Sequence, residues 1–96
     1  MATFISLLTF TDQGIRNVKD SPERLRAFEA MAEKLSVKMK GAYYTVGKYD
    51  MIVITEGADD AATAALLKVS ALGNVRSETL RAFSAEEMKK IIAKIA

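Results

Sequence analysis

Two segments of this sequence are apolar on both sides of a strand, and they constrain the fold more than any other feature. Residues 4–10 and residues 51–54 carry apolar side chains at successive positions, without interruption in the second segment. Successive side chains of a β-strand point to opposite faces of its sheet. Both segments therefore predict strands that are covered on both faces.

The other segments alternate between helical and strand periodicity. Apolar residues recur at helical spacing in three segments, whereas a period of two marks residues 37–46. In chain order, the expected elements are strand 1–10, a helical turn 11–18, helix 21–35, strands 37–46 and 49–56, helix 61–72, strand 75–83 and a terminal helix from 84.

Local signals predict where the helices begin and end. Ser21 suits the N-cap of the first long helix, with Pro22 at its first helical position. Gly73 suits the left-handed residue that ends the second long helix. Ser84 and Glu87 form the capping box of the terminal helix.

Strict alternation along residues 37–46 places Tyr43 and Tyr44 on opposite faces, so at most one of them faces the helices. A hairpin corner is expected at 46–49, where Gly47 permits the turn. The face of Tyr43 is then shared with Val37, Met39, Gly41 and Thr45, and the face of Tyr44 with Lys38, Lys40, Ala42 and Val46.

This order of elements predicts an α+β fold over a single domain, residues 1–96. It is the ferredoxin-like βαββαβ arrangement, with a four-stranded antiparallel sheet and an extra C-terminal helix. Its two long helices cover one face of the sheet and leave the other face bare. An apolar bare face is unfavourable in a monomer, so we expect a symmetric dimer that pairs sheet against sheet.

Composition excludes several classes of protein. The 96 residues contain no Cys and no His, which excludes disulfides, thiolate or imidazole metal sites, and Cys or Ser–His nucleophiles. The 14 basic and 12 acidic residues interleave along residues 20–34, which is typical of a solvated helix face rather than a nucleic-acid-binding stripe. With no secretory signal and no long apolar run, we expect a cytoplasmic protein without metal, cofactor, nucleic-acid or membrane partner.

Gly47-Lys48-Tyr49-Asp50 and the apolar run after it, together with residues 10–15 and 72–83, resemble the GYD domain family over essentially the full length. The family is named for a Gly, Tyr, Asp signature, which Lys48 interrupts here. The resemblance implies a ferredoxin-like subunit that pairs through its sheet as a dimeric α/β barrel. It implies little about activity, because the family is functionally uncharacterised.

Tyr49 and Asp50 are the first candidate site residues, because they stand at the mouth of the hairpin. Asp50 would act as a base or ligand anchor with the Tyr49 phenol as donor, or it would bond local amides while Tyr49 packs. Tyr43 is a candidate to contact a small ring, with aromatic packing as the alternative. Arg76 would anchor an anionic ligand, or else form a salt bridge or an edge-strand charge.

Three kinds of function follow. The first is a homo-oligomeric module that binds a small apolar or anionic molecule between sheet and helices, oriented by Tyr49, Asp50 and a strand arginine. The second is a cofactor-free enzyme, by analogy of fold with small monooxygenases and isomerases, and the third is a structural or adaptor oligomer. The sequence leaves open whether the protein is an enzyme.

Overall fold

A computed structural model describes residues 1–95, so Ala96, the last residue of the expected domain, lies outside the described residues. The elements follow the expected order and confirm the α+β class. They are β1 (Ala2–Phe10), α1 (Asp12–Arg16), a 3-10 turn (Val18–Asp20), α2 (Ser21–Lys34), β2 (Lys38–Tyr44), β3 (Met51–Gly57), α3 (Asp59–Ala71), β4 (Val75–Ala82) and α4 (Ala85–Ala93). None of these helices is long and apolar enough to cross a membrane.

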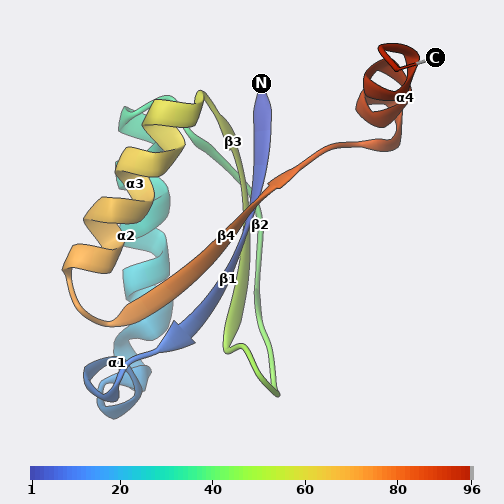
Figure 1. The fold of residues 1–96 in the computed structure, drawn as a ribbon. Helices are drawn as coiled ribbons and strands as arrows, with labels where there is room; N and C mark the ends of the chain where they lie inside the picture. The colour runs from blue at the N-terminus through green and yellow to red at the C-terminus, as the bar shows by residue number, and fades with distance from the viewer. Residues whose placement is uncertain (96) are drawn as a thin grey trace.

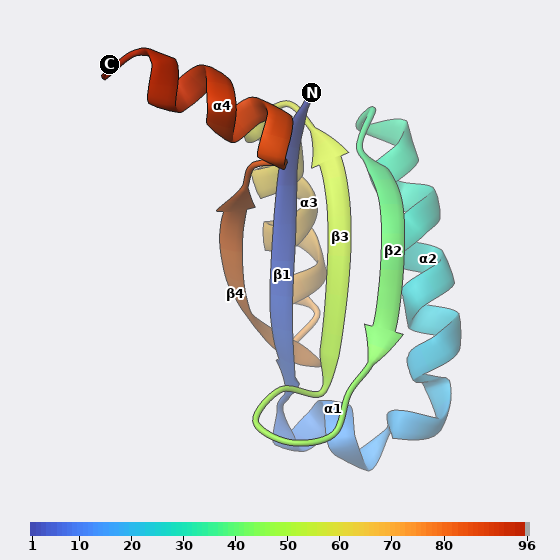
Figure 2. The same cartoon turned by 90° about the vertical axis from the view of Figure 1, so that its right-hand side faces the viewer.

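The four strands form one antiparallel sheet in the order β2-β3-β1-β4. Helices α2 and α3 lie on one side of it, which we call the helix face (Figure 1). Figure 2 looks onto the opposite side, the open face, which α2 and α3 leave uncovered. The two central strands, β1 and β3, are the ones that the sequence marks as apolar on both sides.

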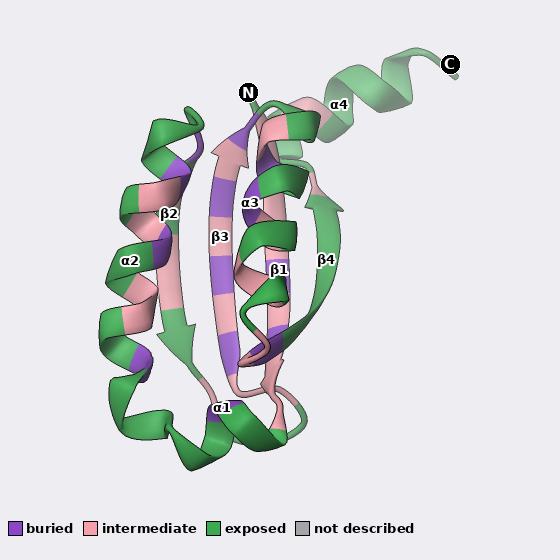
Figure 3. Ribbon diagram, turned by 90° about the vertical axis from the view of Figure 1, so that its left-hand side faces the viewer, coloured by how far each residue is buried: buried purple, intermediate pink, exposed green. Residues whose placement is uncertain are grey.

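The hydrophobic core lies on the helix face. Along β3 the burial alternates, with Met51 and Val53 buried and Ile52 and Ile54 only half-buried (Figure 3). The buried residues that complete the core come from β1, α2, α3, β4 and the connection before β2: Leu8, Phe28, Ala32, Val37, Ala62, Ala65 and Val75. One subunit therefore covers only one face of the strands that the sequence predicts to be covered on both.

Strand β2 departs from the strict alternation predicted for it. Its register with β3 shifts between Met39, which pairs with Thr55, and Gly41, which pairs with Ile54. The intervening Lys40 forms a β-bulge, which reverses the alternation. The prediction that Met39 and Gly41 share a face was therefore wrong.

Tyr43 and Tyr44 nevertheless lie on opposite faces, as predicted. Tyr43 pairs with the open-face residue Ile52, whereas Tyr44 reaches α2 on the helix face. The Tyr44 hydroxyl lies 2.8 Å from the Ser21 hydroxyl. Ser21 is the first residue of α2 and Asp20 precedes it as N-cap, so the prediction of a Ser21 cap was wrong by one position.

The predicted caps at Gly73 and Ser84 are confirmed, whereas α3 begins at Asp59, two residues before the predicted start at 61. Gly73 follows α3 with a φ of +84°, and Ser84 and Glu87 form the capping box of α4. The hydrogen bond from the Ser84 backbone amide lowers the pKa of Glu87 below the ordinary value of a glutamate. Helix α4 extends beyond the end of β4, on the side of the open face, and none of its residues is buried (Figure 1).

Candidate functional site

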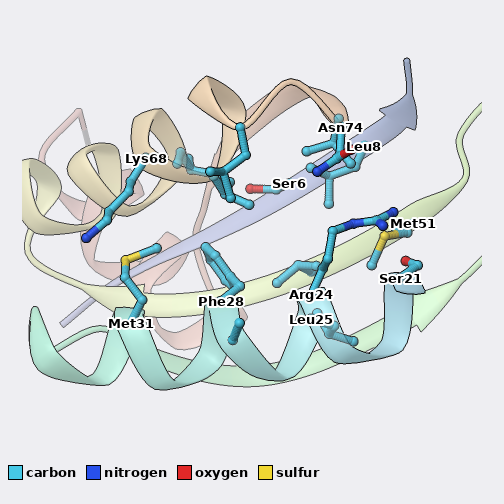
Figure 4. Close-up of a pocket in the computed structure, with 16 residues that line it drawn as sticks. Ser6, Leu8, Ser21, Arg24, Leu25, Phe28, Met31, Met51, Lys68 and Asn74 are labelled. Carbon is cyan, nitrogen blue, oxygen red and sulfur yellow. The ribbon is translucent and has the colours of Figure 1, made fainter. Parts of the chain in front are cut away.

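A cavity of about 310 Å³ lies between the helix face of the sheet and helices α2 and α3. We call it the sheet–helix cavity (Figure 4). Strands β1, β3 and β4 form its floor, and the two helices form its walls. The lining is mostly apolar and includes Leu8, Leu25, Phe28, Met31, Met51 and Val53.

Most polar groups that line this cavity already have partners. The Ser6 hydroxyl lies 2.9 Å from the Thr79 hydroxyl, and the Ser21 hydroxyl bonds Tyr44. Arg24 donates from Nη1 to the backbone oxygen of Asn17 at 2.9 Å, but its Nη2 is buried without a hydrogen-bond partner. Nowhere in residues 1–95 do three His, Cys, Asp or Glu side chains gather as a metal site requires.

The Gly-Lys-Tyr-Asp hairpin ties the end of β1 to the start of β3. The Asp50 carboxylate accepts a hydrogen bond of 2.8 Å from the Phe10 amide, and the Asp50 amide donates to the Leu8 carbonyl at 2.8 Å. On the other side, the Thr45 amide donates to the Asp50 carbonyl at 2.8 Å. Gly47 has a φ of +121°, a conformation that favours glycine.

Tyr49 lies on the open face. Its hydroxyl donates to the Glu78 carboxylate at 2.9 Å. Glu78 is in register with Leu7, an open-face residue of β1, so this bond links the hairpin to the edge strand β4. The ammonium group of Lys48 lies 5.5 Å from the centre of the Tyr49 ring.

Tyr43 and Arg76 lie on the same open face. Tyr43 belongs to the cross-strand row that includes Glu78, and Arg76 is two residues before Glu78 on β4. The structure thus brings Tyr49 into contact with Glu78, which neighbours Arg76 on the same face of β4, and leaves Tyr43 exposed at the opposite edge. The lining of the sheet–helix cavity includes none of Tyr43, Tyr49, Asp50 and Arg76.

Arg24 is the cavity residue that the sequence analysis missed. It was grouped with the interleaved charges of residues 20–34, a solvated-face pattern that suits the exposed Arg26 but not Arg24. The available signal was spacing. Arg24, Phe28 and Met31 are four and three residues apart, so they share one stripe of the helix.

The family model named GYD domain matches residues 4–92 of the chain. The chain belongs to the GYD domain family. This GYD domain is 34% identical over 91 residues to the "Glutamine synthetase and cystathionine beta-lyase binding protein" of Thermus thermophilus. The match covers 92% of this chain and 95% of that relative.

Two solved structures share the fold of this GYD domain. The structure entitled "crystal structure of FFRP-DM1" matches with a TM-score of 0.59 and 23% identity, over 86% of this chain and 100% of that one. TTHA0845 from Thermus thermophilus matches with a TM-score of 0.56 and 22% identity, over 88% of this chain and 96% of its own. Both matches support the ferredoxin-like class and nothing beyond the fold.

Proposed function

We propose that this GYD domain is a self-associating binding module that holds a small apolar molecule in its sheet–helix cavity. The observation that carries the proposal is the cavity itself. A hollow of about 310 Å³ falls within the range of small-molecule sites, at its lower end. Filling it removes apolar side chains such as Leu25 and Phe28 from water, which favours binding.

Self-association is supported by the open face. Ile5 and Ile54 at its centre are only half-buried, and Leu80 beside them is 45% exposed. Contiguous apolar surface of this kind favours a protein partner. A second copy is the occupant that we propose, because two identical open faces meet by a two-fold axis and bury the same apolar rows on each other.

Helix α4 supports the same assembly. Its apolar side chains stay exposed, with Met88 at 41%, Ile91 at 38% and Ile92 at 53%. Because α4 extends on the side of the open face, a second copy seated there comes within its reach (Figure 2). We propose that Tyr43 and Arg76 contribute to this contact, while Tyr49 and Asp50 hold the hairpin that borders it.

The cavity is tested by filling it. Native mass spectrometry of the freshly purified protein should show a non-covalent ligand. Alternatively, thermal unfolding with a library of hydrophobic ligands should show a rise in melting temperature. Val69→Phe places a larger side chain in the cavity lining and should abolish both signals. Leu67→Phe on the exposed side of α3 is the matched control. Equal ligand binding by both variants would overturn the proposal.

The assembly is tested by molar mass in light scattering after gel filtration. Leu80→Glu places a charge on the open face and should convert dimer to monomer. Leu67→Glu, on a leucine that is 67% exposed on α3, should leave the dimer intact. A wild-type monomer, or a dimer that survives Leu80→Glu, would contradict pairing through the open face.

An adaptor role is the second candidate, and the name of the Thermus relative favours it. That protein is named for binding glutamine synthetase and cystathionine β-lyase, and it covers nearly all of this chain. We propose that the glutamine synthetase and the cystathionine β-lyase of the organism that makes this GYD domain are the first protein partners to test. Co-elution of purified proteins in gel filtration would support the adaptor role, and separate elution of both enzymes would contradict it.

A further inference from the structure

We propose that the sheet–helix cavity selects an amphipathic monocarboxylate, with Arg24 at the carboxylate and the apolar walls around the hydrocarbon part. This inference rests on the small-molecule binding proposed above and assigns the chemical class of the ligand. It also assigns a role to Arg24, which lies outside the family signature at Gly47, Tyr49 and Asp50.

The first observation is the unpartnered nitrogen of Arg24. Nη1 is anchored by the Asn17 backbone oxygen at 2.9 Å, which holds the guanidinium in place. Nη2 is buried, and it is the one buried side-chain nitrogen or oxygen of residues 1–95 that lacks a hydrogen-bond partner. A buried N–H donor of a charged group is unfavourable without an acceptor, so an acceptor placed beside Nη2 would lower the free energy of the folded protein.

The second observation is the absence of a counter-charge around it. The residues that line the cavity include neither Asp nor Glu. Within the described part of the chain, the one ion pair joins Lys89 and Glu86 on α4, far along the sequence from Arg24. No acidic side chain of the lining therefore neutralises Arg24, and the anion that we propose for it is a carboxylate, which matches a guanidinium well.

The other polar groups of the cavity argue for a single small anionic group. The hydroxyls of Ser6 and Ser21 are already paired with Thr79 and Tyr44. Lys68 is exposed, and Figure 4 shows its ammonium group at the opposite end of the cavity from Arg24. One free guanidinium nitrogen suits a monocarboxylate, whereas a phosphate group would leave oxygens without donors.

The remainder of the lining defines the rest of the ligand. Leu25, Phe28, Met31, Leu66 and Val69 offer hydrocarbon surface without further unpaired polar atoms. A volume of about 310 Å³ suits a molecule smaller than most drug-sized ligands. Medium-chain alkanoates have this combination of one carboxylate and a short hydrocarbon tail, and octanoate is the probe that we choose.

Isothermal titration calorimetry of octanoate and 1-octanol tests the proposal. Both probes share the same tail, so their difference isolates the carboxylate. We expect wild type to prefer octanoate, and Arg24→Met to weaken octanoate binding by about tenfold or more while octanol binding is kept. Arg26→Met removes an exposed arginine from the same helix and should behave as wild type.

The outcomes separate the two proposals. Equal binding of octanoate by wild type and Arg24→Met would overturn the role of Arg24 but leave small-molecule binding standing. Binding of neither probe to wild type would overturn both proposals.

A second measurement applies if Arg24→Met does not fold. An arginine beside a carboxylate favours its ionised form, so the pKa of carboxyl-¹³C octanoate bound to wild type should lie below that of free octanoate. An unshifted or raised pKa would overturn the proposal.

Discussion

Removal of the Asp50 carboxylate should destabilise the sheet at the end where β1 meets β3. The carboxylate accepts the Phe10 amide at 2.8 Å, and this amide lies at the last residue of β1. A hydrogen bond to a charged group contributes about 1.5–3 kcal/mol. Because this bond is only part-buried, water can replace some of it, and we expect Asp50→Ala to lose about 1.5 kcal/mol.

A graded series separates charge from hydrogen bonding. Asp50→Asn keeps an oxygen acceptor for the Phe10 amide but loses the charge, so we expect a loss of less than about 1 kcal/mol. Tyr49→Phe removes only the exposed bond to Glu78 and should change the free energy of unfolding by about 0.5 kcal/mol.

The assay is urea unfolding at one fixed protein concentration, because self-association would add to the measured stability. If the same variants are unfolded by heat instead, a loss of about 1.5 kcal/mol in a domain of this size corresponds to a fall in melting temperature of roughly 6–12 °C. The urea concentration at the midpoint should fall in the order wild type, Tyr49→Phe, Asp50→Asn, Asp50→Ala. The slope of the unfolding free energy against urea concentration should stay unchanged. An Asp50→Ala midpoint equal to that of wild type would refute the reasoning.

Two further predictions follow from local geometry. A Cβ added at Gly14 would collide with the Asn74 backbone oxygen, so Gly14→Ala should lower the free energy of unfolding in urea by about 2 kcal/mol. A Cβ added at Gly41 meets only side chains at 3.6 Å or more, so Gly41→Ala should lower it far less. Equal losses in the two variants would contradict this reasoning. The hydrogen bond from the Ser84 amide lowers the pKa of Glu87 in the folded protein. The capping bond of Glu87 therefore stabilises α4 fully above the pKa that Glu87 has in the unfolded chain, and this stabilisation is lost as pH falls through the pKa of the folded state. Amide NMR signals of α4 should report this loss in acid, and Glu87→Gln should remove the pH dependence.

The order of elements was predictable because it depends on local patterns. Residues 51–54 indicate a strand whatever surrounds them, and the Ser84–Glu87 capping box joins two residues that are only three positions apart in the sequence. The same holds for Gly73, whose positive φ ends α3. These features are decided within one or two turns of chain, which periodicity and capping chemistry describe well.

The bulge at Lys40 was not predictable, because it depends on how β2 pairs with β3 rather than on β2 alone. Ser21 was misplaced for a related reason, since its hydroxyl bonds Tyr44 from a different element. Arg24 was missed because its neighbours in sequence are charged, whereas its neighbours in space line an apolar cavity. Contacts between residues that are far apart in the sequence decided the bulge, the position of Ser21 and the burial of Arg24 Nη2.

Methyl NMR of one labelled wild-type sample tests most directly whether ligand and partner use opposite faces. Octanoate should shift the methyl signals of cavity residues such as Leu25 and Val69. Dilution of the protein should instead shift those of open-face residues such as Ile54 and Leu80. Octanoate shifts confined to the open face, or dilution shifts confined to the cavity, would contradict the account.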